Sequence, residues 1–323
     1  MKGFIIFAAI AVITTNCGPS KEALELQKKA KLVFGTLPKM MPGSEKDTPE
    51  RVALGEKLYF ETKLSSDNSM SCNTCHNVSG KAGGVDNKPT SKGVLGKNGD
   101  RNSPTVLHAG LHVAQFWDGR AKDLQAQAKG PILNPVEMNM PSAAEVEKKL
   151  SQDPEYVSLF AKAFPGEAKP LNYENLAEAI ASFERTLFAK SKFDDFLEGD
   201  AKALNAAELK GLETFMTTGC TSCHSGNVFG GKMFQKLGLV NAYTTGDLGR
   251  YNVTKAEADK LVFKVPSLRN IAITGPYFHD GSIETLETAV EKMGYHQLGK
   301  NLSSEEVSSI VAFLKTLTDK NRL

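Results

Sequence analysis

Apolar residues recur along most of this chain at intervals of three to four positions, and strict alternation of apolar and polar residues is nearly absent. The first spacing is typical of amphipathic helices and the second of half-buried strands. Helices are therefore expected at 20–32, 49–60 and 173–188, within a mainly α-helical fold. Three later helices begin with the Ser/Asn-x-x-Glu signature of a capping box, at Ser142 and Glu145, Asn205 and Glu208, and Ser303 and Glu306.

The segment 80–104 follows neither period. It is rich in Gly, Lys and Asn, a composition that predicts a loop. Loops of this length are uncommon inside compact domains and are often functional, so 80–104 is a candidate functional segment.

The N-terminus reads Met-Lys, then an apolar run over 4–13, then Thr-Thr-Asn before Cys17. This order is typical of a signal peptide, and an apolar run this short does not span a bilayer, which takes about 20 residues. We expect 1–17 to direct export. Cys17 would either be lipidated, giving a membrane-anchored lipoprotein, or be removed with the signal. The segment 18–45 would form a tether that includes the first helix.

Composition narrows the class further. The chain has 323 residues and a formal net charge of +2, with both signs interspersed. This length suits two domains. No basic stripe suggests nucleic acid as a partner, and no basic amphipathic helix suggests a membrane surface.

Four of the five cysteines lie in two copies of Cys-x-x-Cys-His. This is the attachment signal of a c-type haem, in which both sulfurs bond the haem and the His reaches the iron from one face. A zinc ribbon usually places its Cys pairs about 15–20 residues apart, and a redox dithiol has no need of the His. Two covalent haem c groups are therefore expected, on Cys72, Cys75 and His76 and on Cys220, Cys223 and His224.

Each motif follows a predicted helix and precedes a glycine-rich loop, which is the plan of a cytochrome c domain. We expect two such domains, 46–168 and 169–323, joined near 164–170. The fold class is then mainly α, with two cytochrome c-like domains that each carry one covalent haem. If His or Met occupied the sixth coordination position of both irons, the protein would only carry electrons. An enzyme needs one iron whose sixth position can become free to bind substrate.

Five longer motifs stand at 116–121 (FWDGRA), 127–131 (QAKGP), 134–138 (NPVEM), 265–270 (VPSLRN) and 275–281 (GPYFHDG). Together they resemble the bacterial di-haem cytochrome c peroxidases, within the MauG-like superfamily, over nearly all of the chain after the signal. The resemblance implies reduction of hydrogen peroxide to water with electrons from a small c-type cytochrome or a cupredoxin. Electrons would enter at the C-terminal haem and pass to the N-terminal, peroxide-binding haem.

The resemblance also implies roles for particular residues. His76 would be the proximal ligand of the N-terminal haem, and His224 with Met293 would close the C-terminal haem. Gln127 and Glu137 would line the distal pocket. The chemistry of these residues agrees, because peroxide cleavage needs a general acid/base near the iron and burial of Glu137 in its apolar, Pro-bracketed stretch would raise its pKa. Gln127 can donate a hydrogen bond to the bound peroxide.

Three further expectations come from the resemblance. Trp117, the only tryptophan, would lie between the haems and help electrons to cross. Asn102, Thr274 and Pro276 would bind calcium at the domain interface, largely through carbonyl oxygens. The expected assembly is a homodimer in the periplasm.

One position departs from the family. Its members usually carry, after the first haem motif, a histidine that ligates the resting peroxide haem. Here Val94 stands in that place, and no histidine lies within 81–102. Lys92 and Lys97 are poor substitutes, because an unperturbed lysine has a pKa of about 10.4. We therefore expect an open site that reacts with peroxide before the other haem is reduced.

The remaining histidines are expected to serve the structure. His108 and His112, four residues apart on a possible helix before Trp117, would be packed or polar residues. His279 would be a hydrogen-bonding residue near the second haem, and His296 a surface residue.

Two other functions stay open. One is a MauG-like oxidant of a partner protein, against which Met293 argues because that group has a tyrosine in its place. The other is a non-catalytic di-haem electron carrier or redox sensor. Arg120 and Arg269 are expected to pair with haem propionates or acidic residues.

Overall fold

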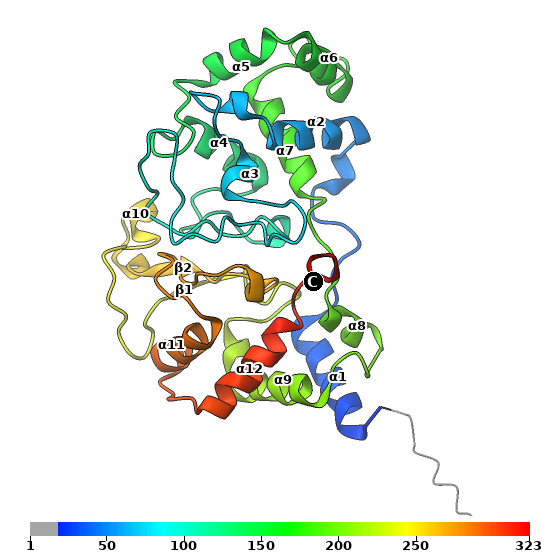
Figure 1. The fold of residues 1–323 in the computed structure, drawn as a ribbon, viewed down its shortest axis with the longest axis vertical. Coiled ribbons are helices and arrows are strands. Elements are labelled where there is room, and N and C mark those ends of the chain that lie inside the picture. The colour runs from blue at the N-terminus through cyan, green and yellow to red at the C-terminus, as the bar shows by residue number, and fades with distance from the viewer. Residues whose placement is uncertain (1–18) are drawn as a thin grey trace, which may run out of the picture.

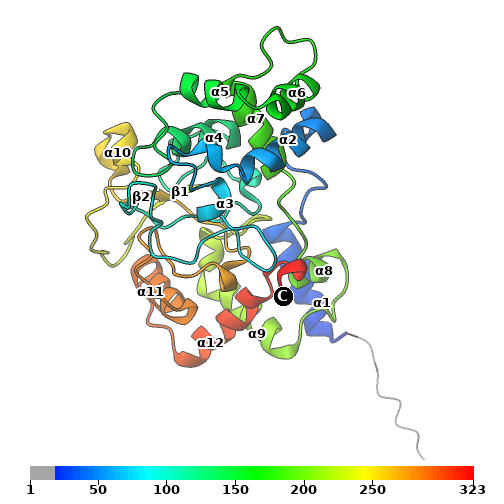
Figure 2. The same ribbon diagram turned by 45° about the horizontal axis from the view of Figure 1, so that its top comes forward.

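The computed structural model describes residues 19–323, and the protein is built mainly of helices that form two halves, one above the other in Figure 1. After the turn in Figure 2, residues 143–163 still lie at the top of the molecule and the helix over 304–315 at the bottom. The predicted signal peptide, including Cys17, lies outside the described residues. No helix among residues 19–323 is long and apolar enough to cross a membrane.

The helices are α1 (Lys21–Phe34), α2 (Pro49–Tyr59), α3 (Cys72–Cys75), α4 (Leu124–Leu133), α5 (Ala143–Ser151), α6 (Pro154–Ala163), α7 (Tyr173–Glu184), α8 (Lys192–Glu198), α9 (Ala206–Thr218), α10 (Tyr251–Thr254), α11 (Leu286–Leu298) and α12 (Ser304–Lys315). One antiparallel pair of short strands, β1 (Phe234–Lys236) and β2 (Val262–Lys264), is paired so that Phe234 lies opposite Lys264.

Each half is organised around one crossing pair of helices, α2 with α7 and α9 with α12. Both crossings occur at a glycine. A Cβ at Gly55 would lie 1.8 Å from the carbonyl oxygen of Ala179, and one at Gly211 would lie 1.9 Å from that of Ser309. Any side chain would push the helices apart, so the absence of a Cβ is what permits these close contacts.

The position of α7 moves the boundary between the halves. Its buried side chains, such as Leu176, Ile180 and Phe183, share one core with Leu54 and Leu58 of α2. The expected boundary at 168/169 would assign α7 to the second half. Because α7 fills the first core, as α12 fills the second, we place the boundary after α7.

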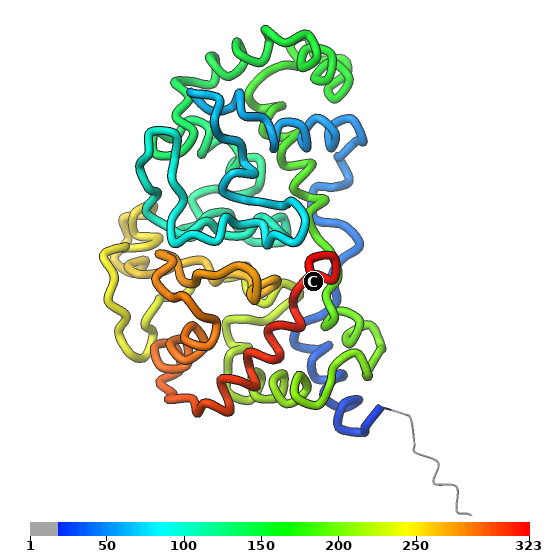
Figure 3. Tube along the Cα trace, viewed as in Figure 1, coloured from blue at the N-terminus to red at the C-terminus, as the bar shows by residue number. Residues whose placement is uncertain are grey.

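The N-terminal helix α1 packs in the second half, although the chain continues from it into the first. Ser20 caps α1, and Ala30 and Phe34 lie in the core of the second half, where Phe34 stacks on Phe229 with ring centroids 4.4 Å apart. The Cα trace then climbs to α2 (Figure 3). The helix within the predicted tether 18–45 thus packs against the C-terminal core.

The two halves meet along a repeated segment. Pro104, Phe116 and Gly119 recur at a constant offset as Pro266, Phe278 and Gly281. Each copy contains a 3₁₀ turn after a residue with positive φ and closes with an antiparallel bridge. The bridges are matched in length, since the Gln115 amide donates to Ala121 and the Tyr277 amide to Ile283, each at 2.7 Å.

The repeated segments bond to each other reciprocally. The amide of Asn102 donates to the carbonyl of His279 at 2.8 Å, and the amide of Lys264 donates to the carbonyl of Trp117 at 2.7 Å. Asn102 and Lys264 occupy equivalent places before the two prolines, and Trp117 and His279 occupy equivalent places between Phe and Asp. The halves are therefore related by an approximate two-fold axis at this interface.

Ion pairs reinforce the same interface. The Arg101 guanidinium, 15 % exposed, contacts Asp118 of its own half at 2.7 Å and Asp247 of the other half at 2.6 Å. Near the C-terminus, Arg322 donates to the carbonyls of Val78 and Gly80 at 3.3 Å. The second half thereby holds the loop that follows the first haem motif.

The predicted helix starts are present with one difference. Asn205 with Glu208 and Ser303 with Glu306 form complete capping boxes. At Ser142 only the serine hydroxyl accepts from a backbone amide. The predicted loop 80–104 has no helix and only a single bridge, between Lys92 and Asn98.

Candidate functional site

Each half contains a cavity, and each cavity contains one Cys-x-x-Cys-His motif. The cavity of the first half has a volume of about 60 Å³ and that of the second half about 230 Å³. The larger cavity extends to the interface between the halves, where the repeated segments line it.

The first cavity brings together two segments that are distant in sequence. Cys72, Cys75 and His76 come from α3 and its end, while Gln127 and Glu137 come from α4 and the turn that follows it. The motif forms a single helical turn, which turns both thiols and the imidazole toward one space. The Tyr59 hydroxyl donates to the His76 carbonyl at 2.5 Å and ties this turn to α2.

Glu137 is a half-buried carboxyl group at the edge of this cavity. Its Oε1 accepts a hydrogen bond from the Asn134 side-chain amide at 2.8 Å. Burial raises the pKa of Glu137 above its usual range, and the Asn134 hydrogen bond and the Arg120 charge only partly offset this effect. The second oxygen, Oε2, has no hydrogen-bond partner among the described residues. The site thus offers a carboxyl group whose raised pKa suits it to exchange a proton as a general acid/base.

The loop that contains Val94, the position that differs from the family, lies against the segment that contains Glu137. The Val94 amide donates to the Glu137 carbonyl at 2.9 Å, and the Gly93 amide donates to the Lys97 carbonyl at 2.9 Å. A Cβ at Gly93 would lie 2.0 Å from the Val136 carbonyl oxygen. Lys92 and Lys97 are both exposed. Of the two, only Lys92 lines the cavity, and His76 is the only histidine that does so.

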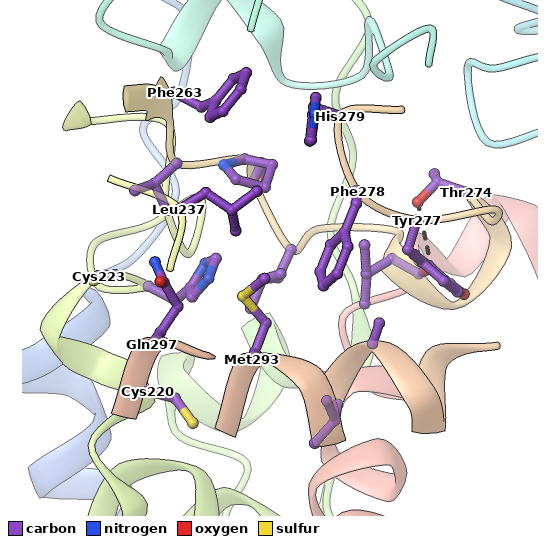
Figure 4. Close-up of a pocket in the computed structure, with 18 of the residues that line it drawn as sticks. Cys220, Cys223, Leu237, Phe263, Thr274, Tyr277, Phe278, His279, Met293 and Gln297 are labelled. Atoms are coloured by element: carbon purple, nitrogen blue, oxygen red, sulfur yellow. Dashed lines mark hydrogen bonds between the residues drawn. The ribbon is translucent and has the colours of Figure 1, made fainter. Parts of the chain in front are cut away.

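The second cavity places Met293 in the same space as the second motif. Figure 4 shows Met293 pointing from α11 into the cavity, with Leu237 and Phe278 beside it. His224 is held by a hydrogen bond between its Nδ1 and the Phe229 carbonyl at 2.9 Å. That bond leaves Nε2 free for a metal, as is usual for a metal-ligating histidine.

Both motifs suit covalent haem better than a redox dithiol or zinc. Burial raises the pKa of the Cys72 thiol to about 12 and that of Cys220 to about 11, whereas a reactive dithiol needs a lowered pKa. Burial lowers the pKa of His76 and His224, which keeps each imidazole in the neutral form that binds iron. No group of three or more His, Cys, Asp or Glu residues among residues 19–323 is arranged to hold a free metal ion. The residues present therefore fit haem.

Trp117 is held between the halves by its backbone and its ring. The indole Nε1 donates to the Asn102 carbonyl at 2.9 Å, and the Trp117 carbonyl accepts from Lys264 of the other half. Trp117 lines the second cavity together with the three residues expected to bind calcium, Asn102, Thr274 and Pro276. The Asn102 side-chain amide donates to the carbonyls of Lys88 and Pro89 at 2.9 and 3.3 Å.

Of the remaining histidines, His108 and His279 are buried, and His112 and His296 are half-buried. His108 and His112 flank a 3₁₀ turn rather than sharing an α-helix, because His108 adopts a positive φ. His279 is 2 % exposed and its Nε2 lies 3.2 Å from the Thr245 hydroxyl, in line with the expected structural role. His296 is half-buried rather than fully exposed, since its Nδ1 bonds the Asn241 carbonyl at 2.9 Å.

Both arginines pair with acids, as expected. Arg120 contacts Asp118 at 3.1 Å. Arg269 and Asp194 form a fully buried pair, in which each is 1 % exposed and the closest contact is 2.7 Å.

Two buried ionisable residues were not anticipated from the sequence. Glu184 at the end of α7 lines the first cavity with its Oε2 unpartnered, and burial raises its pKa to about 8. Lys264 lines the second cavity, and burial lowers its pKa to about 8. In the internal repeat, Lys264 occupies the position equivalent to Asn102. This equivalence is the sequence signal that could have drawn attention to the lysine.

Comparisons with known proteins cover both halves. Residues 49–202 match the family described as "Di-haem cytochrome c peroxidase", and residues 209–318 match "Cytochrome c". The chain is 46% identical to the cytochrome c551 peroxidase of Pseudomonas aeruginosa over 94% of this chain and 89% of that one. It is 49% identical to the cytochrome c551 peroxidase of Nitrosomonas europaea over 84% of this chain and 81% of that one. A solved structure of a MauG-like protein associated with microbial copper homeostasis is similar with a TM-score of 0.78 and 28% identity, over 88% of this chain and 94% of that one.

Proposed function

The chain belongs to the di-haem cytochrome c peroxidase family, and on that premise we propose that it reduces hydrogen peroxide to water with electrons from a small c-type cytochrome or a cupredoxin. The observation that carries the proposal is the first cavity. It joins a haem attachment motif to a carboxyl group and an amide from a separate segment. An electron carrier has no need of an acid/base beside its iron.

Two side chains are proposed to act on the peroxide, Glu137 as the acid/base and Gln127 as a hydrogen-bond donor. Cys72, Cys75 and His76 would hold the haem, which when bound would supply an iron site for peroxide and the electrons for its reduction. Glu137 Oε2 takes the proton of the near oxygen and returns it to the leaving oxygen, while Asn134 holds Oε1 in place. Gln127 donates a hydrogen bond that orients the peroxide. Reduction to two waters consumes two electrons and two protons in all.

Electrons would enter at the haem held by Cys220 and Cys223 and ligated by His224 and Met293. The position of Met293 in the cavity of the second motif supports this assignment, and methionine ligation raises the potential of a haem. Trp117 would help electrons to cross toward the first haem. Its hydrogen bonds to both halves hold the ring at the interface.

The first haem is proposed to be open in the fully oxidised protein. Support comes from Val94, whose side chain cannot bind iron, and from the first cavity, where His76 is the only lining histidine. Lys92 is the remaining candidate ligand in that cavity. Electron paramagnetic resonance of the oxidised protein tests this point. A dominant high-spin ferric signal from one haem is expected, and two low-spin ferric signals at neutral pH would contradict it.

A stopped-flow assay tests the proposed function against its alternatives. Oxidised and half-reduced protein are mixed with peroxide, followed by a reduced cytochrome donor. A peroxidase oxidises the donor in proportion to peroxide, and here both starting forms should do so. A carrier or sensor oxidises only the donor needed to fill its two haems, and a MauG-like oxidant consumes peroxide only with a protein substrate. Met293 supports the first outcome.

Further parts of the proposal concern the surroundings of the enzyme. Asn102, Thr274 and Pro276 would bind calcium at the interface, and the chain would act as a homodimer in the periplasm. Lipid anchoring at Cys17 is also proposed, and mass spectrometry of the mature N-terminus tests it. Calcium content measured after dialysis, with and without a chelator, tests the metal site.

A further inference from the structure

The second cavity contains a buried cation that no acid balances. Lys264 of β2 is 6 % exposed. The only hydrogen-bond partner of its ammonium among the described residues is His112, whose Nδ1 lies 3.3 Å from the Lys264 Nζ. A buried lysine ordinarily forms an ion pair with a carboxylate. Lys264 forms no such pair with any residue of 19–323.

The neighbourhood of Lys264 adds positive charge rather than removing it. His112 is half-buried, and its Nε2, which solvent does not reach, has no hydrogen-bond partner among the described residues. Burial is the main cause that lowers the pKa of His112, and the charges of Lys264, His108 and Lys232 lower it further. No acidic residue contributes in the opposite direction. The pocket thus presents an ammonium group and an imidazole N–H donor with no anion to receive them.

Such an arrangement is costly unless an anion completes it, because a buried charge without a partner is strongly destabilising. The cavity is already expected to receive one anionic molecule. Lys264 and His112 line it together with Cys220, His224 and Met293, and a haem c brings two propionate carboxylates. We propose that Lys264, assisted by His112, binds a propionate of the C-terminal haem and thereby sets the potential at which that haem accepts electrons.

The two-fold relation between the halves supports this assignment independently. Lys264 and His112 are the counterparts of Asn102 and Thr274, two of the proposed calcium ligands. One of these two equivalent places would therefore recruit a calcium ion, while the other would supply a positive charge from the chain itself. Only this comparison depends on the calcium proposal. The assignment of Lys264 rests on the haem motifs and the unpaired charge.

A fixed cation beside the haem has a predictable electrostatic effect. It stabilises the reduced iron, which carries one more electron, relative to the oxidised iron. Removing the charge should therefore lower the midpoint potential. The backbone amide of Lys264 bonds the carbonyl of Trp117, the residue proposed to connect the haems, and both residues line the second cavity.

The test compares Lys264→Met with Lys236→Met in the holoprotein. Methionine matches the length of the lysine stem without its charge. Lys236 is an exposed lysine on the neighbouring strand β1, and its ammonium has no ion-pair partner among residues 19–323, so it controls for loss of a lysine nearby. The potentials of both haems are measured by spectroelectrochemistry, without peroxide or donor. A pyridine haemochrome assay confirms two attached haems, and the charge-transfer band of methionine-ligated ferric haem confirms Met293 ligation.

The expected result is a downward shift of the C-terminal haem potential in Lys264→Met, largely restored in Lys264→Arg and absent in Lys236→Met. An unchanged potential in Lys264→Met, with both haems attached and Met293 bound, would overturn the proposal. So would equal shifts in the Met and Arg variants. If Lys264→Met does not accumulate, His112→Leu tests the same site, and the absence of any shift there also counts against it. Because no turnover is measured, these outcomes are independent of whether the protein is a peroxidase.

Discussion

The proposed proton transfer makes a sharp prediction for Glu137→Gln. Glutamine keeps the shape of the side chain and can still accept the Asn134 hydrogen bond through its own Oε1, which is the contact seen at 2.8 Å. Its amide nitrogen then replaces Oε2, the atom proposed to take the proton. An amide nitrogen donates hydrogen bonds but is not a base near neutral pH. The substitution should remove the chemistry and leave the packing intact.

The expected size of the loss follows from that analysis. A general acid/base contributes about 10²- to 10⁴-fold to a rate. Even the lower figure corresponds to about 2.7 kcal/mol of transition-state stabilisation, at about 1.36 kcal/mol per tenfold change. Haem spectra and the rate of electron entry from the donor should stay unchanged. The pH profile adds a second signature. Glu137 must be ionised to act as a base, so turnover should fall as the pH drops through its raised pKa, and the Gln variant should lose this limb.

Glu145→Gln is the matched control, because Glu145 is exposed on α5 and forms only a surface pair with Lys148. Such pairs contribute little. Steady-state oxidation of a reduced cytochrome c and stopped-flow mixing with peroxide are measured for both variants. If Glu137→Gln turned over peroxide as fast as Glu145→Gln, Glu137 would have no part in the mechanism.

Three further changes test the structure. Val94→His should supply an imidazole beside Glu137 and make the resting first haem low-spin, so that turnover requires prior reduction; an unaltered high-spin signal would show that position 94 does not reach the iron. Gly211→Ala should lower stability by about 1–3 kcal/mol through overpacking at the α9–α12 crossing, as measured by chemical denaturation, whereas Gly246→Ala, with open space around it, should not. Arg269→Met should cost about 3–5 kcal/mol because it leaves the Asp194 carboxylate buried and uncompensated, and a much smaller loss would mean that water reaches the pair.

Local patterns predicted the helices well because their signals lie within a few residues. The Asn–Glu capping box at Asn205 is one such signal, and its geometry is complete in the structure. The amphipathic pattern of α7 was also correctly read as a helix. Which core α7 fills depends on the crossing at Gly55, a contact with a residue more than a hundred positions away, so no local pattern could place the domain boundary.

The site shows the same division. The haem motifs are contiguous, and their spacing alone predicted the attachment chemistry. Gln127 and Glu137 were assigned through the family resemblance, and their meeting with His76 in one cavity is a tertiary fact. The internal repeat aligns Lys264 with Asn102, but the lack of an acidic partner for this lysine is visible only once the surrounding side chains are placed.

The reciprocal hydrogen bonds at the interface have the form of an isologous contact. Residue i of one copy bonds residue j of the other, and the equivalent i and j bond in return, as in a symmetric homodimer. In a true homodimer every substitution occurs twice, so the two sides must stay identical. Joined in one chain, the two sides are free to diverge. Trp117 stands in one half where His279 stands in the other, and Asn102 stands where Lys264 does, although the backbone hydrogen bonds are the same. Covalent linkage is thus what allows a two-fold architecture to hold two unlike redox centres at a constant separation.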